Sequence, residues 1–213
     1  MFLTRLILTP QNFYDFRITD DYSLHRVVYS LFRKEDQVRI LYADKGVKKG
    51  FRTVFILSAV EPVAPENSQI HMESKTFSES FLTHQRYVFE ILLNPVRRSG
   101  EARMHGEKEV KNLVPVGDKN PEIARKLLLE WFLEKGAANG FQPDEENLMI
   151  RICNSQTFTQ KNLADKTVTH HKVLFSGTLT VTEPELFRTA FENGIGRAKA
   201  FGFGLLQIQP ILD

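Results

Sequence analysis

The chain contains 213 residues, 42% of them hydrophobic, with 28 Lys and Arg residues against 26 Asp and Glu residues. This is enough apolar material for a hydrophobic core, which excludes a disordered chain, and the length fits one domain or two small ones. The net charge of +2 is too small to indicate nucleic-acid binding by itself, so any basic binding surface must be local.

In the first half of the chain, hydrophobic alternation and capping residues predict strands and helices in turn. Residues 2–9 alternate bulky and polar side chains before Pro10, and Asp20 or Asp21 can cap the helix that follows. Segments rich in β-branched and aromatic residues flank a Lys/Gly turn, which predicts a hairpin. The predicted elements are a strand at 2–9, a helix at 22–34, strands at 38–43 and 52–60, a short helix at 76–82 and a strand at 86–93. Their order is β-α-β-β-α-β.

The second half begins after a break in the apolar pattern. Residues 94–111 carry Pro, Gly and five basic residues, which predicts a linker or loop between two halves. Pro121 is a good first-turn residue for a helix that stops at Gly136. The later predicted elements are strands at 148–154 and 168–181, a helix at 183–192 and a strand at 203–209, with a further polar strand or loop between 154 and 167.

The two halves contain strands and helices in a similar order, although their sequences are not repeats. We therefore predict an α+β fold made of two tandem ferredoxin-like (βαββαβ) domains. The first domain is predicted to cover residues 1–94, a basic linker loop residues 95–111, and the second domain residues 112–213.

The predicted helix at 22–34 presents a candidate site on one face. At about 100° per residue, its apolar residues fall on the opposite face, which packs on the sheet. The residues on the candidate face are Tyr22, His25, Arg26, Tyr29 and Arg33. Histidine exchanges protons near neutral pH and arginine matches phosphate geometry, so this face can perform acid–base work on a phosphate. The alternative is a solvated helix face on which His25 and Tyr22 are incidental, and spacing alone does not decide between the two.

A glycine-rich segment lies near the C-terminus. Residues 193–206 read NGIGRAKAFGFGLL and contain four glycines and two cations. Backbone N–H groups exposed at glycines can hold phosphate oxygens, which predicts contact with a phosphate backbone. The segment lacks the Gly-Lys-Ser/Thr of a Walker A loop, and Lys199 stands where a dinucleotide fingerprint needs its third glycine. The alternative is a glycine-rich connection packed tightly against the sheet. The predicted contacts are Gly194, Gly196, Arg197, Lys199, Gly202 and Gly204.

Three further segments have a local surplus of basic residues. From Arg33 to Arg52 there are seven basic and three acidic residues, and from Arg151 to Lys172 four basic and one acidic. Together with the basic residues of 97–111, these segments suit a phosphodiester chain whose affinity falls as salt rises. Solvated loops are the alternative for each of them.

The sequence predicts neither a metal site nor a cofactor. His170 and His171 adjoin on a predicted strand, so their side chains face opposite sides and cannot share a metal in regular geometry. The single cysteine, Cys153, excludes a disulfide framework and a zinc site of several thiolates, and it points to a reducing compartment. The N-terminus is interrupted by Arg5 and is too short for a signal peptide, and no apolar run approaches the roughly 18 residues of a membrane span. We therefore expect a cytoplasmic protein without a membrane partner.

Five motifs occur together from one end of the chain to the other. They are FLTRLIL at 2–8, DxYxLHRxxYxLF at 20–32, NPVRR at 94–98, FSGTLTV at 175–181 and GIGRAKAFGFGLL at 194–206. In these motifs the chain resembles the CasE (Cse3) family of CRISPR repeat-processing endoribonucleases of type I-E systems, within the RAMP superfamily. The joint occurrence of the helix motif and the glycine segment is specific, whereas the glycine segment alone indicates only the superfamily.

The resemblance implies a tandem RAMP/RRM-like fold that binds the stem-loop of CRISPR repeat RNA and cuts at the base of the stem without a metal. It also implies that the crRNA product stays bound and that the protein joins the other Cascade subunits. The family's catalytic histidine falls on His25, its assisting tyrosine on Tyr22, and an RNA-contacting position on Arg26. Its groove-inserting β-hairpin maps to about residues 151–172. The predicted RNA contacts outside the glycine segment are Arg26, Arg33, Arg97, Arg98, Arg103, Arg151, Lys161 and Lys166.

A metal-free cut of this kind uses the 2′-hydroxyl of the RNA as nucleophile and leaves a 2′,3′-cyclic phosphate and a 5′-hydroxyl. His25 would act as general acid or base, Tyr22 would orient or share the proton transfer, and Arg26 with nearby lysines would stabilise the phosphate. Two other functions stay open. One is a non-catalytic RNA-binding RAMP subunit of a CRISPR complex. The other is a magnesium-dependent nucleotide hydrolase that uses the glycine segment, which the missing Walker residues disfavour.

Overall fold

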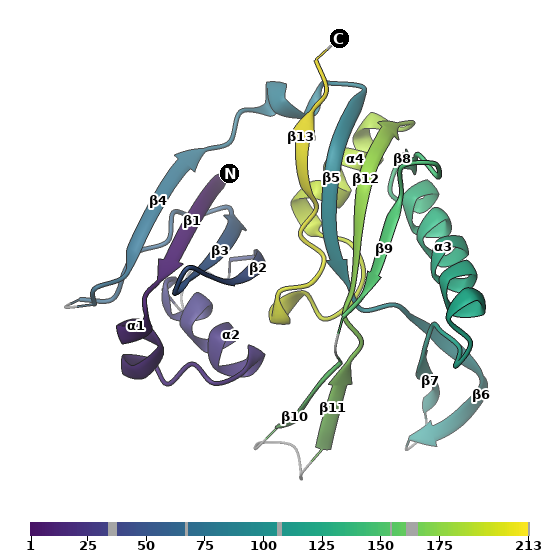
Figure 1. The fold of residues 1–213 in the computed structure, drawn as a ribbon, viewed down its shortest axis with the longest axis horizontal. Helices are drawn as coiled ribbons and strands as arrows, with labels where there is room; N and C mark the ends of the chain where they lie inside the picture. Colours follow the sequence, from purple (N-terminus) through teal and green to yellow (C-terminus); the bar gives the residue numbers. More distant parts are fainter. Residues whose placement is uncertain (34–37, 67, 106–107, 154, 161–165, 213) are drawn as a thin grey trace.

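The protein is described by a computed structural model over residues 1–33, 38–66, 68–105, 108–153, 155–160 and 166–212. Two antiparallel sheets stand side by side, each with its own helices, and two hairpins extend from one end of the second sheet (Figure 1). The predicted α+β class of two tandem ferredoxin-like units is confirmed. Among the described residues, no helix is long and apolar enough to cross a membrane.

The first sheet has the strand order β2-β3-β1-β4, with every neighbouring pair antiparallel. The first and third strands along the chain are therefore central, as in a ferredoxin-like unit. Alternation along the strands buries Leu6, Leu8 and Val54 under the helices, as the period of two requires. The strands are β1 (Phe2–Leu8), β2 (Ile40–Lys48), β3 (Phe51–Ser58) and β4 (His71–Thr76).

Two helices, α1 (Pro10–Asp15) and α2 (Asp21–Ser30), connect β1 to β2. Pro10 was predicted only to end the first strand. It is in fact the first residue of α1, because its fixed φ suits the first helical turn and Thr9 caps that turn. Among the described residues between β3 and β4 there is no second helix. The predicted helix at 76–82 is reduced to a 3₁₀ helix, η2 (Glu79–Leu82), which follows β4.

The second sheet has the strand order β13-β5-β12-β8, and β9 also pairs with β12. Its central strands are β5 and β12, and its two long helices pack on one face. Its strands are β5 (Arg86–Leu93), β8 (Phe141–Pro143), β9 (Met149–Ile152), β12 (Val173–Val181) and β13 (Gln207–Pro210), and its helices are α3 (Pro121–Ala138) and α4 (Pro184–Asn193).

The prediction that β5 ends the first domain is wrong. β5 pairs with β12 on one side and β13 on the other, so it is the first strand of the second unit. The fourth strand of the first unit is β4, whose sequence HMESKT lacks the apolar alternation of a central strand because it lies at a sheet edge. The crossing between the units therefore follows β4, at η2, and the predicted ranges 1–94, 95–111 and 112–213 do not match the sheets.

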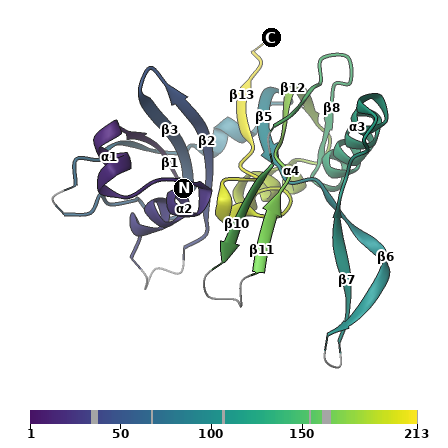
Figure 2. The same ribbon diagram turned by 60° about the horizontal axis from the view of Figure 1, so that its bottom comes forward.

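Two hairpins project from the second unit (Figure 2). β6 (Val96–His105) pairs with β7 (Lys108–Pro115), so most of the predicted linker loop forms regular strands that continue β5. β10 (Gln156–Gln160) pairs with β11 (Lys166–His170) inside the segment that the resemblance assigns to a groove-inserting hairpin. Both hairpins point away from the sheet (Figure 2).

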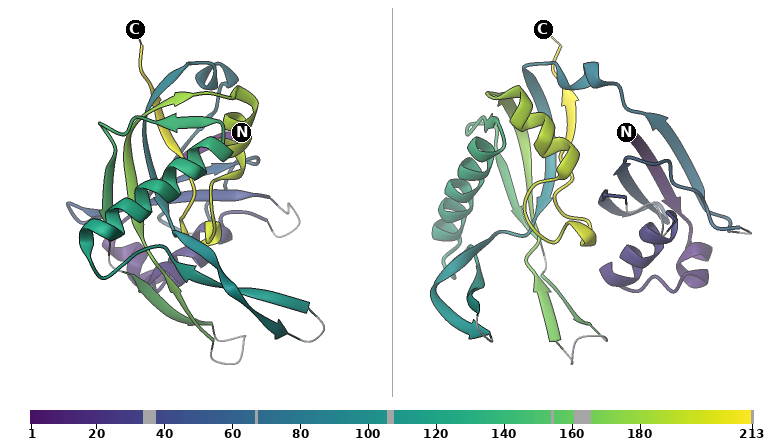
Figure 3. Two further views of the ribbon diagram at one scale, coloured as in Figure 1. Left: turned by 90° about the vertical axis from the view of Figure 1, so that its right-hand side faces the viewer. Right: turned by 180° about the vertical axis from the view of Figure 1, so that it is seen from behind.

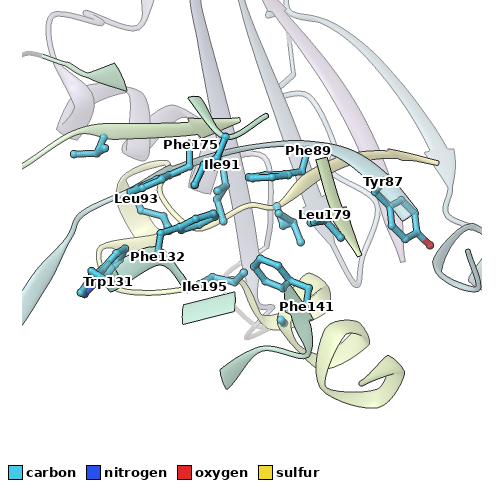
Figure 4. Close-up of a cluster of buried hydrophobic side chains, with 14 of the residues drawn as sticks. Tyr87, Phe89, Ile91, Leu93, Trp131, Phe132, Phe141, Phe175, Leu179 and Ile195 are labelled. Atoms are coloured by element: carbon cyan, nitrogen blue, oxygen red, sulfur yellow. The ribbon is translucent and has the colours of Figure 1, made fainter. Parts of the chain in front are cut away.

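The larger core lies between the second sheet and its helices (Figure 4). Phe132 of α3 stacks on Phe175 of β12 with ring centroids 4.2 Å apart and planes 12° apart. Both rings are fully buried, and each contributes about 1.5–3 kcal/mol through burial of apolar surface. This core fixes β5, β12 and α4, which in turn hold the glycine segment.

The glycine segment after α4 lies between the two sheets, where it approaches α2 and β2 (Figure 3, right). A small apolar cluster joins the units at this place, formed by Leu41 and Leu57 of the first sheet with Phe191 of α4 and Leu205 of the segment. Helix α2 of the first unit is thus held against a segment of the second.

Candidate functional site

Helix α2 positions the candidate site because its two faces differ. Asp20 caps the helix by accepting a hydrogen bond from the Ser23 N–H at 2.7 Å, which satisfies one of the unpaired N–H groups of the first turn. Leu24, Val27 and Val28 are buried against the first sheet. The predicted opposite face is confirmed for the four residues within the helix, which are Tyr22, His25, Arg26 and Tyr29.

The side chain of His25 is tied to the second unit by a hydrogen bond. Its Nδ1 lies 2.6 Å from the carbonyl oxygen of Ala200. A carbonyl oxygen only accepts, so Nδ1 carries the proton and donates it. In the neutral ring Nε2 is then unprotonated, and it is the nitrogen that can take a proton from another group.

Aromatic rings surround the imidazole of His25. Its centroid lies 4.2 Å from the ring of Tyr29, 5.3 Å from Phe201 and 6.1 Å from Tyr22. Burial among these rings lowers the pKa of His25, and the hydrogen bond to Ala200 raises it by a smaller amount. The lowered pKa favours the neutral imidazole near neutral pH, which is the state that a general base requires.

Tyr42 of β2 donates a second hydrogen bond to the same carbonyl. Its hydroxyl lies 3.1 Å from the oxygen of Ala200, and its side chain is fully buried. Burial raises the pKa of Tyr42, and the charge of Asp21 adds to this, so the hydroxyl stays protonated as a donor. Sequence reasoning missed this residue because Tyr42 has the pattern of an ordinary strand residue.

Three of the four glycines act inside the fold rather than at a phosphate. The N–H groups of Gly194, Gly202 and Gly204 donate to the carbonyls of Ala190, Lys199 and Leu92, at 2.8, 3.3 and 2.9 Å. The prediction that these three N–H groups hold phosphate oxygens is therefore wrong, because each already has a partner within the protein.

Close packing explains why glycine is needed at these positions. A Cβ at Gly202 would lie 2.8 Å from the Tyr42 ring, and one at Gly194 would lie 2.7 Å from Leu41. Both have positive φ, at 83° and 73°, which L side chains rarely adopt. Gly196 and Arg197 are exposed at the tip of the segment, and the prediction that they contact RNA stays open.

Lys199 borders an open cleft beside His25. Its ammonium donates to the carbonyl of Asn193 at 2.8 Å, which satisfies an acceptor at the end of α4. Burial lowers the pKa of Lys199, and so does the nearby Arg39 cation. The cleft has a volume of about 690 Å³ and is also lined by Tyr29 and Ala200. Arg39 is the cation that sequence reasoning did not single out, although it lies in the basic segment that begins at Arg33.

A buried ion pair joins α2 to the start of β12. Lys172 Nζ lies 2.5 Å from Asp21 Oδ2, and the two side chains are 17% and 7% exposed. Next to it, His170 is 5% exposed and lies 4.9 Å from the ring of Phe201. The β10–β11 hairpin is therefore connected, through Lys172, to the helix that carries His25.

The other predicted cations lie in several places. Arg33 is exposed beyond the end of α2. Arg97 and Arg98 lie on β6, on the far side of the second sheet from α2 (Figure 1), and Arg97 contacts Glu134 at 3.5 Å. Arg103 is placed on β6 and Lys166 on β11 by their backbone, Arg151 is exposed on β9, and Lys161 lies outside the described residues. Of the predicted site residues, Tyr22 and Arg26 lie on α2 with His25, and Lys199 and Gly202 lie within two residues of the carbonyl that His25 contacts. Arg151 and Gly202 line a second cleft, beside Asp21 and Leu24 of α2.

This arrangement suits proton transfer at a phosphodiester. It combines an imidazole with an unprotonated Nε2, exposed rings on which a base can stack, and an exposed arginine one residue further along the helix. Among the described residues no group of three or more His, Cys, Asp and Glu side chains could hold a metal ion.

Comparisons with known proteins extend over the whole chain. Residues 1–210 match a family model described as CRISPR associated protein. The chain is 27% identical to the CRISPR-associated endoribonuclease Cse3 of Thermus thermophilus, over 99% of this chain and 100% of that protein. The structure of Thermus thermophilus Cse3 bound to an RNA representing a pre-cleavage complex aligns with a TM-score of 0.72 at 24% identity, over 98% of each chain. A chain of E. coli Cascade bound to a PAM-containing dsDNA target aligns with a TM-score of 0.51 at 16% identity, over 99% of this chain and 100% of that one. At these identities, the structural matches show a shared fold.

Proposed function

The chain belongs to the CRISPR-associated protein family, as its resemblance to CasE (Cse3) proteins indicated, and on that premise we propose that it is an endoribonuclease that processes CRISPR repeat RNA. It binds the stem-loop of each repeat and cuts the strand at the base of the stem. The relative from Thermus thermophilus is named an endoribonuclease, and its structure holds an RNA that represents a pre-cleavage complex, which supports this proposal.

The reaction is an attack of the 2′-hydroxyl on the adjacent phosphorus. Nε2 of His25 takes the proton of that hydroxyl, the 2′ oxygen bonds to phosphorus, and the bond to the 5′ oxygen breaks. Tyr22 gives the leaving 5′ oxygen its proton or orients a water that does so. The products are a 2′,3′-cyclic phosphate and a 5′-hydroxyl.

Cations near His25 stabilise the extra negative charge of the transition state. Arg26 is exposed on the same face of α2 and can approach a phosphate bidentately. Because a side chain supplies the base and the substrate supplies the nucleophile, we propose that the cut needs no metal ion.

One observation carries the catalytic part of the proposal, namely the hydrogen bond from His25 Nδ1 to the Ala200 carbonyl. It leaves Nε2 as the acceptor, and a solvated helix face with an incidental histidine would not need this bond. The alternative, a non-catalytic RNA-binding subunit, would use the same exposed face only to hold RNA.

RNA binding is proposed to extend from α2 over the hairpins. A-form RNA is recognised through backbone shape and 2′-hydroxyl contacts, which suits a projecting β-hairpin and scattered cations. The proposed contacts, all from the sequence prediction, are Arg26, Arg33, Arg97, Arg98, Arg103, Arg151, Lys161, Lys166, Gly196, Arg197 and Lys199. We also propose that the protein keeps its product and joins other subunits, since a chain of the same fold occurs in E. coli Cascade.

Incubating the full chain with stem-loop repeat RNA in excess EDTA, followed by mapping of both product ends, tests the proposal. We expect one cut at the base of the stem, with a cyclic phosphate on one product and a 5′-hydroxyl on the other. Tight RNA binding with no product at saturating RNA, with or without added Mg²⁺, would instead favour the non-catalytic subunit.

A further inference from the structure

Resting on the proposed function, we infer that Tyr42 is a positioning residue for the reaction, which holds the Ala200 carbonyl and thereby fixes His25 in its Nδ1–H tautomer. The glycine segment of the second unit is then part of the catalytic apparatus of the first. It sets the orientation and proton position of the base, and the N–H groups of Gly194, Gly202 and Gly204 bind carbonyls within the protein and not phosphate.

The carbonyl of Ala200 receives two donors from the first unit. Tyr42 donates at 3.1 Å from β2, and His25 donates at 2.6 Å from α2. A carbonyl oxygen has two lone pairs, so these bonds use its full acceptor capacity. Any displacement of this carbonyl changes the bond to His25 directly.

The backbone around Ala200 is held in a restricted conformation. Ala198 has φ 62°, which is left-handed for a residue with a side chain, and Gly202 follows with φ 83°. Such conformations persist where surrounding contacts enforce them. Here the contact is the ring of Tyr42, over which Gly202 passes so closely that a Cβ would lie 2.8 Å away. Tyr42 therefore holds the segment through its ring and its hydroxyl together.

The position of the proton on His25 decides whether the ring can act as base. A neutral imidazole carries one proton, and the nitrogen that faces a carbonyl must be the one that carries it. If the carbonyl moves, the ring can adopt the other tautomer, in which Nε2 is protonated and cannot take the proton of the 2′-hydroxyl. Loss of positioning thus lowers the rate of the bound complex and leaves RNA affinity unchanged.

Tyr42→Phe tests this inference, because it removes only the hydroxyl and keeps the ring against Gly202. Tyr87→Phe is the matched control, since Tyr87 is also fully buried and its hydroxyl donates to a backbone carbonyl, that of Phe81, at 2.8 Å. Tyr87 lies in the core of the second unit, and its hydroxyl also accepts from the His84 N–H at 3.1 Å, so its substitution should cost at least as much stability as Tyr42→Phe without changing the rate.

Two readouts separate positioning from a structural role. In single-turnover cleavage at saturating RNA, we expect Tyr42→Phe to be slower by about tenfold with an RNA Kd within about twofold of wild type, and Tyr87→Phe to match wild type. In long-range ¹H–¹⁵N NMR of the RNA-free chain, the neutral ring of His25 should be protonated at Nδ1 in the wild type and mixed in Tyr42→Phe.

The NMR readout does not depend on cleavage, so it keeps the inference testable even if the chain proves to be a non-catalytic RNA-binding subunit. A wild-type His25 protonated at Nε2 would overturn the inference, whether or not Tyr42→Phe folds. Equal rates for the two variants would overturn it as well, even with a changed tautomer. A parallel loss of rate and RNA binding in Tyr42→Phe would assign Tyr42 to general folding instead.

Discussion

Replacing Gly202 by alanine perturbs the contact that holds the glycine segment to the first unit. The left-handed conformation at φ 83° costs an L residue about 1–2 kcal/mol. The new Cβ would also lie 2.8 Å from Cε2 and 3.3 Å from Cδ2 of a fully buried Tyr42 ring, and such overpacking costs about 1–3 kcal/mol. Alanine also lowers the conformational entropy of the unfolded chain, which stabilises the fold by about 0.4–1 kcal/mol and offsets part of these costs. We expect a net destabilisation of about 1–5 kcal/mol.

Gly50→Ala is a closely matched control. Gly50 has φ 84°, but a Cβ at this position would have no atom within 4 Å, so the substitution costs only the backbone conformation. Urea unfolding of both variants should therefore show that Gly202→Ala is less stable than Gly50→Ala by about 1–3 kcal/mol, the cost of the clash alone. In thermal unfolding, each kcal/mol corresponds to about 2–4 °C for a chain of this size.

The same pair of variants reports on the site. Because Gly202 lies two residues after Ala200, relief of the clash moves the carbonyl that binds His25, and the cleavage rate should fall in Gly202→Ala but not in Gly50→Ala. Equal stabilities for the two variants would refute the packing argument. A destabilised Gly202→Ala that still cleaves at the wild-type rate would refute the link between the segment and His25.

Three further outcomes are expected. Lys172→Met should destabilise the fold by about 3–5 kcal/mol in urea unfolding, because it leaves Asp21 buried without its partner. The double variant with Asp21→Asn should recover most of this stability. No recovery in the double variant would contradict the assignment of a buried ion pair. Arg197→Ala should weaken RNA binding and lower the salt-dependence slope by about 1 without changing the rate at saturating RNA, and an unchanged slope would remove Arg197 from the RNA surface. Since burial lowers the pKa of His25, the single-turnover rate should fall on acidification with a midpoint below the ordinary histidine pKa of about 6.5, and a rate that rises on acidification would identify His25 as the acid instead.

Much of the fold follows from local patterns in the sequence. The face of α2 that carries Tyr22 and His25 was predictable because apolar residues at helical spacing fix the opposite face against the sheet. The strands β5 and β12 were predictable because they are apolar and end at clear turn residues, whereas the short β8 and the polar hairpin of β6 and β7 were not predicted as strands. The assignment of β5 to a sheet was not, because strand pairing is a non-local property and the polar β4 shows no core-strand pattern.

The side chains of the candidate site were predictable from the sequence, but the backbone group that orients His25 was not. His25 and Tyr22 stand out on a helical wheel, but the acceptor that orients His25 is a backbone carbonyl 175 residues away, which no residue type reveals. The four glycines of residues 193–206 predicted a loop that binds phosphate. At Gly194 and Gly202 the actual constraint is the approach of Leu41 and Tyr42, which belong to the other unit and become neighbours only in the folded chain.

The most direct test of the account is single-turnover cleavage of stem-loop repeat RNA in EDTA by the wild type and by His25→Ala, with RNA that carries a 2′-deoxy group just before the cut as the second substrate. We predict that the wild type cleaves the natural RNA but not the deoxy RNA, and that His25→Ala binds RNA equally well and cleaves it about 10²–10⁴ times more slowly. Cleavage of the deoxy RNA, or an unchanged rate in His25→Ala, would contradict the account.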